Sequence, residues 1–489
     1  MGSLIPSTKH HAVLVPYPAQ GHINPFMQLA KLLHSKGFHI TFVNNDHNHR
    51  RLLRTKGLDF VQGLEGLRFE AVADGLPPSD RDATQDVPKL TESIFNKSMN
   101  QPFSDLLQRL NSTPGSPPVT CVISDVAMFF AWDVADELGI PNVQFWTASA
   151  CGLLGYLQYD ELLRRAIVPF KDENFMTDGS LEALIDWIPG MPNMRLKDLP
   201  SFMRTTSPDD VLFYYLRTIS TKALKSSALL LNTFDDFEHE VVEEMKKMQP
   251  NIFLGGPLNM LLRHTSKTEI TSLTTSLWKE DTHCLEWLDK QEPESVVYIN
   301  YGSVTIMSDH HLNEFAWGLA NSKHPFLWIV RPDVVMGESG TLPKEFYDEI
   351  KDRGLITSWC PQPEVLKHPS VGVYLTHCGW NSITESLVGG VPLMCWPFFA
   401  EQQTNSRFAC TVWGTGVEVN ADVKREELAE QVMEMLEGRR GQELRRNAKE
   451  WRRKAEEASD IGGSAYADFD RFMEKLVQLS DQNQQSATA

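Results

Sequence analysis

A polar turn between an apolar run and a predicted helix has the residue types that bind phosphate. The mostly apolar residues 371–375 are followed by the polar residues 376–382, which include a glycine. A strand that enters a helix through a glycine turn directs free backbone N–H groups and the positive end of the helix dipole to one point. His377, Asn381 and Ser382 can also donate hydrogen bonds to phosphate oxygens. The pattern predicts an anion site at the start of this helix.

Four more side chains near this turn match the other parts of a nucleotide-sugar. Glu385 lies one helical turn further on and can accept from a pair of ribose hydroxyls, and Trp359 offers a flat face for a base. Glu401 and Gln402 place a carboxylate beside an amide, as the paired hydroxyls of a hexose require. Base, ribose, diphosphate and sugar each have a partner, so the stretch indicates a nucleotide-sugar site.

Two of these residues have simpler explanations. Ser382 and Glu385 spell the capping box S-x-x-E, which would account for Glu385 without a ribose. Trp359 could pack in the core, which is the commoner role of tryptophan.

A second group in the first half of the chain could move a proton. His22 follows the apolar residues 12–15, in a loop rich in proline and glycine, and its imidazole can accept a proton near neutral pH. Asp125 ends another apolar run, at the carboxyl end of a predicted strand, where α/β folds collect functional groups. Asp125 could instead be a helix N-cap. The sequence alone does not bring His22 and Asp125 together.

The elements that position these groups alternate between strand and helix. The first helix is expected to begin at Phe26 and to stop at Gly37. Continuous apolar strands between helices predict a parallel sheet covered on both faces. The expected strands are residues 12–15, 40–43, 119–123, 141–146 and 228–231 in the first half, and 296–299, 326–330, 371–375 and 391–396 in the second.

Bulk composition limits the partners. The formal net charge of −18 disfavours nucleic acid and anionic membranes, and no apolar run reaches the ~18 residues that a membrane span needs. The seven cysteines are scattered without metal or disulfide spacing, and no signal peptide is read, so a cytoplasmic location is expected. We expect a monomer without nucleic-acid or membrane partners.

Other catalytic motifs are weak or absent. The strings 80–82 and 468–470 read Asp-x-Asp, but one lies in a polar loop and the other in a helical tail, so no metal requirement is predicted. No G-x-G-x-x-G follows a strand, which disfavours a dinucleotide oxidoreductase.

Residues 359–402 resemble the signature box of plant family-1 UDP-sugar-dependent glycosyltransferases. The opening W-x-x-Q (Trp359 and Gln362), the central H-C-G-W-N-S-x-x-E from His377 to Glu385, and the closing E-Q all stand in register. The resemblance covers nearly the whole chain and is good near residues 12–33, 119–152 and 296–303.

This resemblance implies an α/β fold called GT-B, with two facing Rossmann-like parallel-sheet domains and a cleft between them. The implied parts are residues 1–257 for the acceptor-binding domain and 278–460 for the UDP-sugar-binding domain. Residues 258–277, rich in Ser and Thr at 262–277, would be a mobile linker. Residues 461–489 would form a helix that packs back on the first domain and a polar tail.

The resemblance also assigns site residues. It pairs His22 with Asp125 as general base and assisting carboxylate, matched in H-x-N-P and I-S-D. The implied UDP contacts are Ser303, Trp359, Gln362, His377, Trp380, Asn381, Ser382 and Glu385. The implied sugar contacts are Thr147, Trp380, Glu401 and Gln402. The candidate acceptor-lining residues are Ile23, Met128, Phe129 and Phe130.

The implied activity is inverting transfer of glucose from UDP-glucose to a hydroxyl of a small plant metabolite, with no cofactor. In this family glutamine at position 402 is associated with glucose and histidine with galactose. Residues 186–203 and W-P-F-F-A-E-Q-Q-T-N resemble the subgroup that glucosylates terpenoids, cyanohydrins and cytokinins, and phenolics are also expected acceptors. The alternatives are a non-catalytic nucleotide-sugar or small-molecule binder and a hydrolysing or epimerising enzyme on the same fold.

Overall fold

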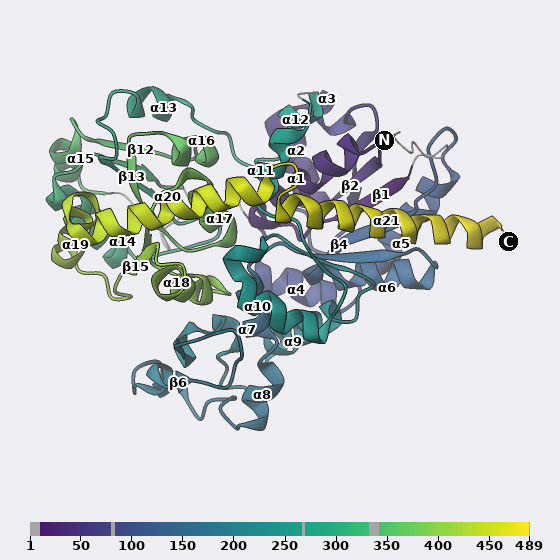
Figure 1. Cartoon of the computed structure of the whole chain (residues 1–489), viewed down its shortest axis with the longest axis horizontal. Helices are drawn as coiled ribbons and strands as arrows, with labels where there is room; N and C mark the ends of the chain where they lie inside the picture. Colours follow the sequence, from purple (N-terminus) through teal and green to yellow (C-terminus); the bar gives the residue numbers. More distant parts are fainter. Residues whose placement is uncertain (1–9, 80–83, 267–268, 332–341, 489) are drawn as a thin grey trace. The chain divides into compact units, whose positions relative to one another are not determined.

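The computed structural model of the chain describes residues 10–79, 84–266, 269–331 and 342–488 (Figure 1). These fall into two compact units. Unit 1 comprises the described residues of Met1–Phe175, Phe202–Leu277 and Ala458–Ala489, and unit 2 those of Met176–Ser201 and Trp278–Glu457.

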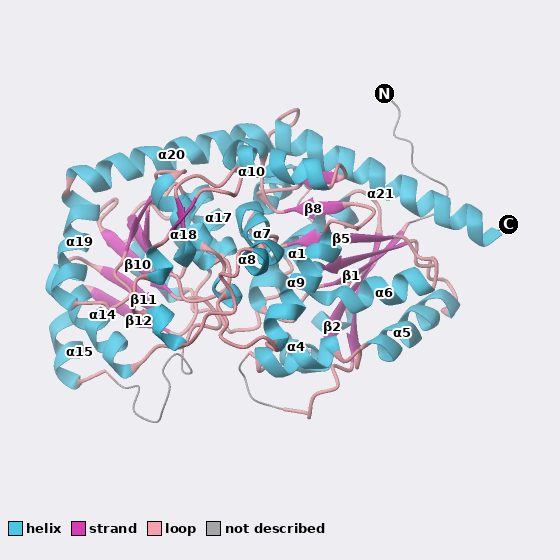
Figure 2. Ribbon diagram, turned by 90° about the horizontal axis from the view of Figure 1, so that it is seen from below, coloured by secondary structure: helices cyan, strands magenta, loops and turns pink. Residues whose placement is uncertain are grey.

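Unit 1 is built on a parallel sheet in the order β3-β2-β1-β4-β5-β8-β9. Strands β1, β4 and β5 are buried along their whole length, so both faces of the sheet are covered, and Figure 2 shows the surrounding helices. The strands are β1 (His11–Val15), β2 (His39–Asn45), β3 (Leu67–Val72), β4 (Cys121–Asp125), β5 (Asn142–Trp146), β8 (Leu229–Leu231) and β9 (Ile252–Leu254).

The α-helices of unit 1 are α1 (Gln20–Ser35), α2 (Asp46–Lys56), α3 (Leu58–Gln62), α4 (Val87–Phe95), α5 (Asn100–Ser112), α6 (Phe129–Glu137), α7 (Ala150–Tyr156), α8 (Tyr159–Arg164), α9 (Val211–Ala223), α10 (Asp235–Met248), α11 (Leu258–Leu261), α12 (Glu269–Ser272) and α21 (Ser464–Thr488). In α21, Phe472 is fully buried and its ring lies 5.8 Å from that of Phe253 in β9.

Unit 2 repeats the same plan, with parallel strands in the order β12-β11-β10-β13-β14-β15. Trp328 of β11 is fully buried in its core beside Phe315 and Phe346. The strands are β10 (Val296–Asn300), β11 (Phe326–Ile329), β12 (Gly354–Thr357), β13 (Val371–Thr376), β14 (Leu393–Cys395) and β15 (Gly416–Glu418). The helices are α13 (His283–Leu288), α14 (Asp309–Ser322), α15 (Lys344–Ile350), α16 (Gln362–Lys367), α17 (Trp380–Gly389), α18 (Gln402–Thr411), α19 (Arg425–Glu437) and α20 (Arg439–Ser459).

The expected start of the first helix was wrong. Helix α1 begins at Gln20 rather than Phe26, and it contains Pro25. A proline this near the start removes one backbone hydrogen bond, while Ile23 and Phe26 on the same helix are fully buried against the sheet. Tertiary packing therefore outweighs the proline signal.

Two segments group differently from the expected domain limits. Residues 176–201 belong by their contacts to unit 2, although they precede part of unit 1 in the chain. This segment contains a short antiparallel pair, β6 (Leu184–Ile185) with β7 (Met194–Arg195).

The expected mobile linker, residues 258–277, groups with unit 1 in its described part. The carboxamide oxygen of Gln20 accepts from the backbone N–H of Leu277 at 2.7 Å, and the Lys31 ammonium donates to the carbonyl of Thr271 at 3.0 Å. Polar side chains of α1 thus bond two backbone groups of this segment and connect them to unit 1. Among the described residues, no helix is long and apolar enough to cross a membrane.

Candidate active site

His22 and Asp125 meet at the carboxyl edge of the unit 1 sheet. Strand β1 pairs with β4, and the residues that follow both strands lie at the point where strand order reverses. His22 lies in the first turn of α1, and Asp125 is the last residue of β4. The Nδ1 atom of His22 lies 2.7 Å from Oδ2 of Asp125.

The surroundings of Asp125 favour one orientation of the imidazole. Asp125 is 1% exposed, and its other oxygen accepts from the backbone N–H of Ala127 at 2.9 Å. It therefore also caps the short 3-10 helix Val126–Met128, as the simpler explanation proposed. A carboxylate held in this way keeps the proton of His22 on Nδ1 and leaves Nε2 as the basic nitrogen. The side chain of His22 is 34% exposed, so a ligand can reach it.

Thr147 lies beside this pair. Its hydroxyl oxygen is 2.9 Å from Nδ1 of His22, and the residue is buried. In the structure its polar contact is with the histidine; the expected contact with the sugar stays a prediction.

The four candidate acceptor residues are all buried. Ile23, Met128, Phe129 and Phe130 are at most 5% exposed. Phe130 packs edge-on against Phe103 at 5.7 Å. Phe130 thus serves the core of unit 1, and acceptor contacts of the four residues stay a prediction.

The glycine turn of unit 2 has the predicted strand–turn–helix form. Strand β13 ends at Thr376 and α17 begins at Trp380, with Gly379 as its N-cap. Cys378 has a left-handed φ of 64°, which non-glycine residues rarely adopt. The Thr376 hydroxyl accepts from the N–H of Cys378 at 3.1 Å, and Asn405 donates to the Cys378 carbonyl at 2.9 Å.

The start of α17 has the features of an anion site. No side chain caps this helix and its first turn has no acidic residue, so its first N–H groups are not bonded by a capping side chain. A helix start of this kind attracts phosphate oxygens. Asn381 is partly exposed, whereas Trp380 is 3% exposed and its ring lies 5.9 Å from that of Trp413.

His377 lies between two glycines of neighbouring loops. A Cβ atom added to Gly302 or to Gly379 would lie 2.5 Å from Nε2 of His377. Burial lowers the pKa of His377 to about 4. The imidazole is therefore neutral at physiological pH and carries a single N–H donor.

Glu385 belongs to a buried hydrogen-bond network centred on Gln362. The amide nitrogen of Gln362 donates to Glu385 at 2.7 Å and to the Ser382 hydroxyl at 3.2 Å. Its oxygen accepts from Asn300 at 2.7 Å and from Tyr374 at 3.0 Å. The Gln362 side chain is thus engaged within the protein, and its expected contact with the nucleotide stays a prediction.

Burial raises the pKa of Glu385 to about 7, although the hydrogen bond from Gln362 acts in the opposite direction. Glu385 is 8% exposed as a residue. The capping-box explanation for Ser382 and Glu385 is wrong, because Gly379 is the N-cap and Ser382 is the third residue of the helix. A capping box therefore does not account for the burial of the Glu385 carboxyl group.

Trp359 is partly exposed and not a core residue. Its ring stacks on that of Trp278 with centroids 5.8 Å apart. The simpler core-packing explanation therefore accounts for only part of its surface.

Ser303 lies in the loop that follows β10. Its carbonyl accepts from Arg331 at 2.5 Å, and the same guanidinium donates to the carbonyl of Thr305 at 2.7 Å. Arg331 is 3% exposed, so a buried cation fixes the loop that carries Gly302 and Ser303.

Glu401 and Gln402 lie at the start of α18. Gln402 is 5% exposed, and its carboxamide oxygen accepts from the backbone N–H groups of Phe398 and Phe399 at 2.9 and 3.0 Å. Because its oxygen is used in this way, the amide nitrogen is the group of Gln402 that could donate to a ligand.

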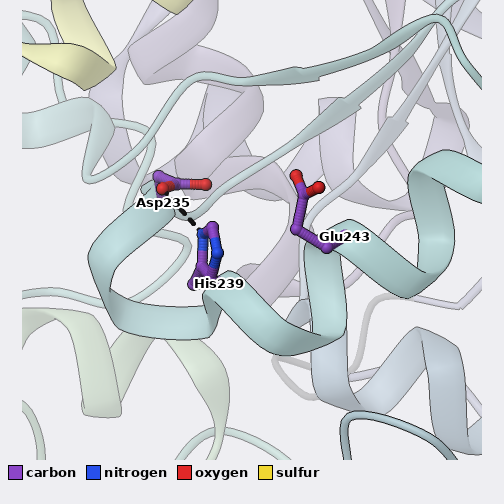
Figure 3. A group of neighbouring side chains, drawn as sticks. All are labelled: Asp235, His239 and Glu243. Carbon is purple, nitrogen blue, oxygen red and sulfur yellow. Dashed lines mark hydrogen bonds and ion pairs between the residues drawn. The ribbon is translucent and has the colours of Figure 1, made fainter.

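Within the described residues, one group of side chains could ligate a metal ion. Asp235, His239 and Glu243 have ligand atoms within 4.8 Å of one another along α10 (Figure 3). His239 already bonds Asp235 at 2.9 Å, and Glu243 pairs with Lys246 at 3.0 Å. The group lies on a different element from His22 and Asp125. The absence of a metal requirement stays a prediction, and the Asp-x-Asp string 80–82 lies outside the described residues.

Arg331, Asn405 and Thr376 were not predicted from the sequence, although they hold the loop 302–305 and the turn 377–379 in place. The signal for Arg331 was a charged residue two positions after the buried strand β11. Asn405 gave no signal, since its role depends on α18 packing against the turn 377–379.

The comparisons with known proteins agree with this geometry. A model of the family "UDP-glucoronosyl and UDP-glucosyl transferase" matches residues 26–444. The chain is 57% identical over 485 residues to linamarin synthase 1 of Manihot esculenta, covering 99% of this chain and 100% of that protein. It is 49% identical over 479 residues to (R)-mandelonitrile beta-glucosyltransferase of Prunus dulcis, covering 98% and 99%.

Among solved structures, the chain resembles Os79 of O. sativa in complex with UDP. The TM-score is 0.78 and the identity 29%, with 95% of this chain and 100% of that chain covered. Together with the two parallel sheets, this likeness confirms the GT-B fold class. The chain therefore belongs to the plant family-1 UDP-glycosyltransferases, enzymes that use a UDP-sugar as co-substrate.

Proposed function

We propose that this enzyme transfers glucose from UDP-glucose to a hydroxyl of a small plant alcohol and inverts the anomeric carbon. The observation that carries the proposal is the hydrogen bond of 2.7 Å between Nδ1 of His22 and the buried carboxylate of Asp125. This bond orients the imidazole of His22, whose side chain is 34% exposed, and it would stabilise the imidazolium that forms when Nε2 takes a proton.

In the proposed reaction, Nε2 of His22 takes the proton of the acceptor hydroxyl as the oxygen attacks C1 of the glucose. The new C1–O bond forms on the face opposite the phosphate, and the bond from C1 to the UDP oxygen breaks with its electron pair leaving on UDP. An α-linked donor then gives a β-glucoside. General-base assistance of this kind contributes roughly 10²- to 10⁴-fold in rate.

Unit 2 is proposed to hold the donor. The first N–H groups of α17, with His377, Asn381, Ser382 and Ser303, would bind the diphosphate and stabilise the leaving UDP. Glu385 would accept from the ribose hydroxyls, and Trp359 would stack on the uracil. For the sugar we propose Glu401, Gln402, Trp380 and Thr147.

The proposed acceptors are cyanohydrin and terpenoid alcohols. One relative is named for mandelonitrile as acceptor and for the β configuration of its product, at 49% identity over nearly the full length. We further propose a cytoplasmic monomer, and the absence of any disulfide among the seven cysteines supports a reducing compartment.

The test is an acceptor screen with UDP-glucose, in which mass spectrometry detects the gain of a hexose and NMR gives the anomeric configuration. We expect β-glucosides of small cyanohydrins or terpenoid alcohols and only slow release of UDP without an acceptor. Rapid formation of free glucose without acceptor would instead support a hydrolase. Binding of UDP-glucose without any turnover would support a non-catalytic binding protein.

A further inference from the structure

The turn that precedes α18 contains a residue in an unfavourable backbone conformation. Ala400 has a φ of 60°, in the left-handed region that residues with a Cβ atom rarely adopt. It directly precedes Glu401 and Gln402, the proposed sugar contacts. The direction of these two side chains therefore depends on what keeps Ala400 in this conformation.

Ser201 holds Ala400 through both of its backbone groups. The backbone N–H of Ala400 donates to the Ser201 hydroxyl at 2.8 Å, and the backbone N–H of Ser201 donates to the Ala400 carbonyl at 2.9 Å. The two residues are 199 positions apart in the sequence. This reciprocal pair fixes the peptide groups on both sides of the Ala400 Cα atom.

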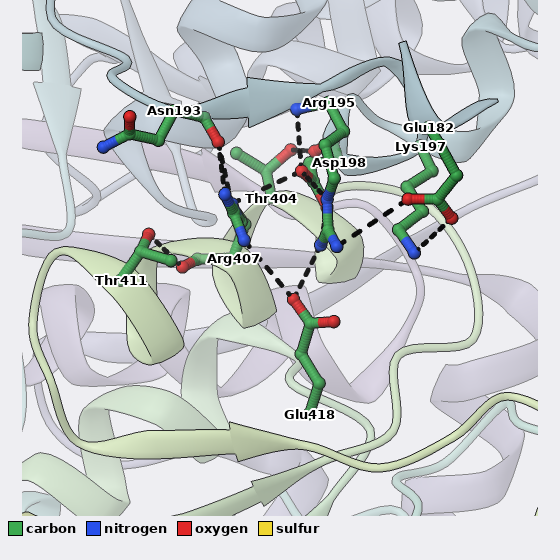
Figure 4. A network of polar contacts seen from close by, with 9 residues as sticks. All are labelled: Glu182, Asn193, Arg195, Lys197, Asp198, Thr404, Arg407, Thr411 and Glu418. Carbon is green, nitrogen blue, oxygen red and sulfur yellow. Dashed lines mark hydrogen bonds and ion pairs between the residues drawn. The ribbon is translucent and has the colours of Figure 1, made fainter. Parts of the chain in front are cut away.

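The same segment contacts α18 at two further places. The Thr404 hydroxyl donates to the carbonyl of Asp198 at 2.7 Å, and Arg407 donates to the carbonyl of Asn193 at 3.0 Å (Figure 4). Residues 201, 198 and 193 thus contact residues 400, 404 and 407, in that order. The two segments therefore run in opposite directions along this contact. We call residues 193–201 the brace of helix α18.

Charged groups attach the brace to helix α18 and strand β15 of the same unit. Figure 4 shows Arg195 between Asp198 and Glu418, with N–O distances of 2.7 and 2.6 Å. Asp198 is 4% exposed and also accepts from the backbone N–H of Arg195 at 2.8 Å. Arg407 reaches Asp198 at 3.4 Å and Glu418 at 3.7 Å. Asp198 is the buried member of this network, and a buried carboxylate whose bonds are satisfied in this way favours one geometry of residues 195–198.

The brace acts on Gln402 through a defined chain of contacts. The Gln402 oxygen accepts from the N–H groups of Phe398 and Phe399. The next residue of this turn is Ala400, which is hydrogen-bonded to Ser201. A change in the Ala400 conformation would alter this turn and rotate the amide of Gln402.

We propose that Ser201 is a positioning residue for recognition of the donor sugar, acting through Ala400 on Glu401 and Gln402. The proposal rests on the proposed role of those two residues as sugar contacts. Ser201 touches neither the nucleotide-binding turn 377–379 nor the Gln362 network in the described contacts, so its effect should fall on the sugar and leave UDP binding unchanged.

The test compares Ser201→Ala and Thr404→Val with the wild type. We expect each variant to raise KM for UDP-glucose about tenfold or less, the equivalent of one lost hydrogen bond. We expect the ratio of kcat/KM for UDP-glucose over UDP-galactose to fall several-fold, because these donors differ only at one sugar hydroxyl. The dissociation constant for UDP should stay within a factor of two of the wild type.

Two matched variants serve as controls. Ser201→Thr keeps the hydroxyl and should restore the wild-type sugar ratio. Thr411→Val removes a hydroxyl on the same helix that donates to the carbonyl of Arg407 at 2.7 Å, within the helix itself, and should leave the ratio unchanged.

A wild-type sugar ratio in Ser201→Ala, with a changed ratio in Gln402→Ala, would overturn the positioning role and leave the proposed function intact. An equal loss of affinity for UDP and UDP-glucose would also overturn it, since it would indicate general loosening of unit 2. If Gln402→Ala and Glu401→Ala keep the wild-type ratio, the turn does not read the sugar, and both the proposed sugar contacts and the role of Ser201 are wrong.

Discussion

The carboxyl group of Glu385 gives a prediction in which stability and ligand binding change in opposite directions. Its pKa is raised by burial from the ordinary value of 4.5 to about 7. Between these two values, the unfolded carboxyl loses its proton while the folded one keeps it. The contribution of Glu385 to wild-type stability should therefore fall as pH rises through this window and stay low above pH 7.

The substitution Glu385→Gln removes this titration and keeps the shape of the side chain. Its amide oxygen can still accept from Gln362, as the carboxylate does at 2.7 Å. One pKa unit corresponds to about 1.4 kcal/mol, so the variant should be more stable than the wild type by about 3 kcal/mol at pH 8 and about 1 kcal/mol at pH 5. Urea denaturation at the two pH values measures this difference.

The same variant should bind the donor more weakly. An ionised carboxylate is a stronger acceptor for ribose hydroxyls than an amide, and hydrogen bonds to charged groups contribute about 1.5–3 kcal/mol. UDP-glucose is the suitable probe because, unlike UDP, it has no phosphate group that titrates near pH 6. Calorimetric titration should show wild-type affinity increasing as pH rises through about 7, whereas the affinity of Glu385→Gln stays constant.

Two results would refute this reasoning. If Glu385→Gln changes stability equally at pH 5 and pH 8, the carboxyl does not titrate in the folded state near pH 7. If wild-type affinity for UDP-glucose is independent of pH over this range, Glu385 does not bind the ribose as a carboxylate.

Asp125→Asn should lower kcat by about 10²-fold or more with little change in UDP affinity, because an amide does not hold the proton of His22 on Nδ1 or stabilise the imidazolium. Steady-state kinetics measures kcat and calorimetry measures UDP affinity. An unchanged kcat would contradict this prediction. Gly379→Ala should weaken UDP binding, because its Cβ would lie 2.5 Å from Nε2 of His377 and must displace the ring. As a control, Gly139→Ala has open space around its Cβ and tests only the strain of a left-handed residue, so it should leave UDP binding unchanged. Equal UDP affinity of Gly379→Ala and wild type in calorimetry would show that the ring position does not matter for binding.

The sequence predicted the central strands of both sheets but not the edge strands. All nine predicted strands occur within two residues of their expected ends. The strands at the sheet edges, β3 and β9 in unit 1 and β12 and β15 in unit 2, were not predicted. Central strands are buried on both faces and read as continuous apolar runs, whereas edge strands such as β12 are partly exposed and give a weaker pattern.

Some features of the site depend on consecutive residues, and others depend on contacts between residues far apart in the sequence. The turn 377–379 and the helix that follows it are encoded in consecutive residues and could be predicted. The contact of His22 with Asp125 spans 103 positions and came only from a family resemblance. No local sequence pattern and no family motif indicated the contact between Ser201 and Ala400, so it is found only in the structure.

The most direct test of the central claim compares glucoside formation by the wild type and by His22→Gln in one assay, with UDP-glucose and a small cyanohydrin alcohol at saturation. We expect a β-glucoside from the wild type, and a rate at least about 10²-fold lower from a variant that still binds UDP-glucose normally. Equal rates from the two proteins would rule out His22 as the general base, because the acceptor would then lose its proton without it.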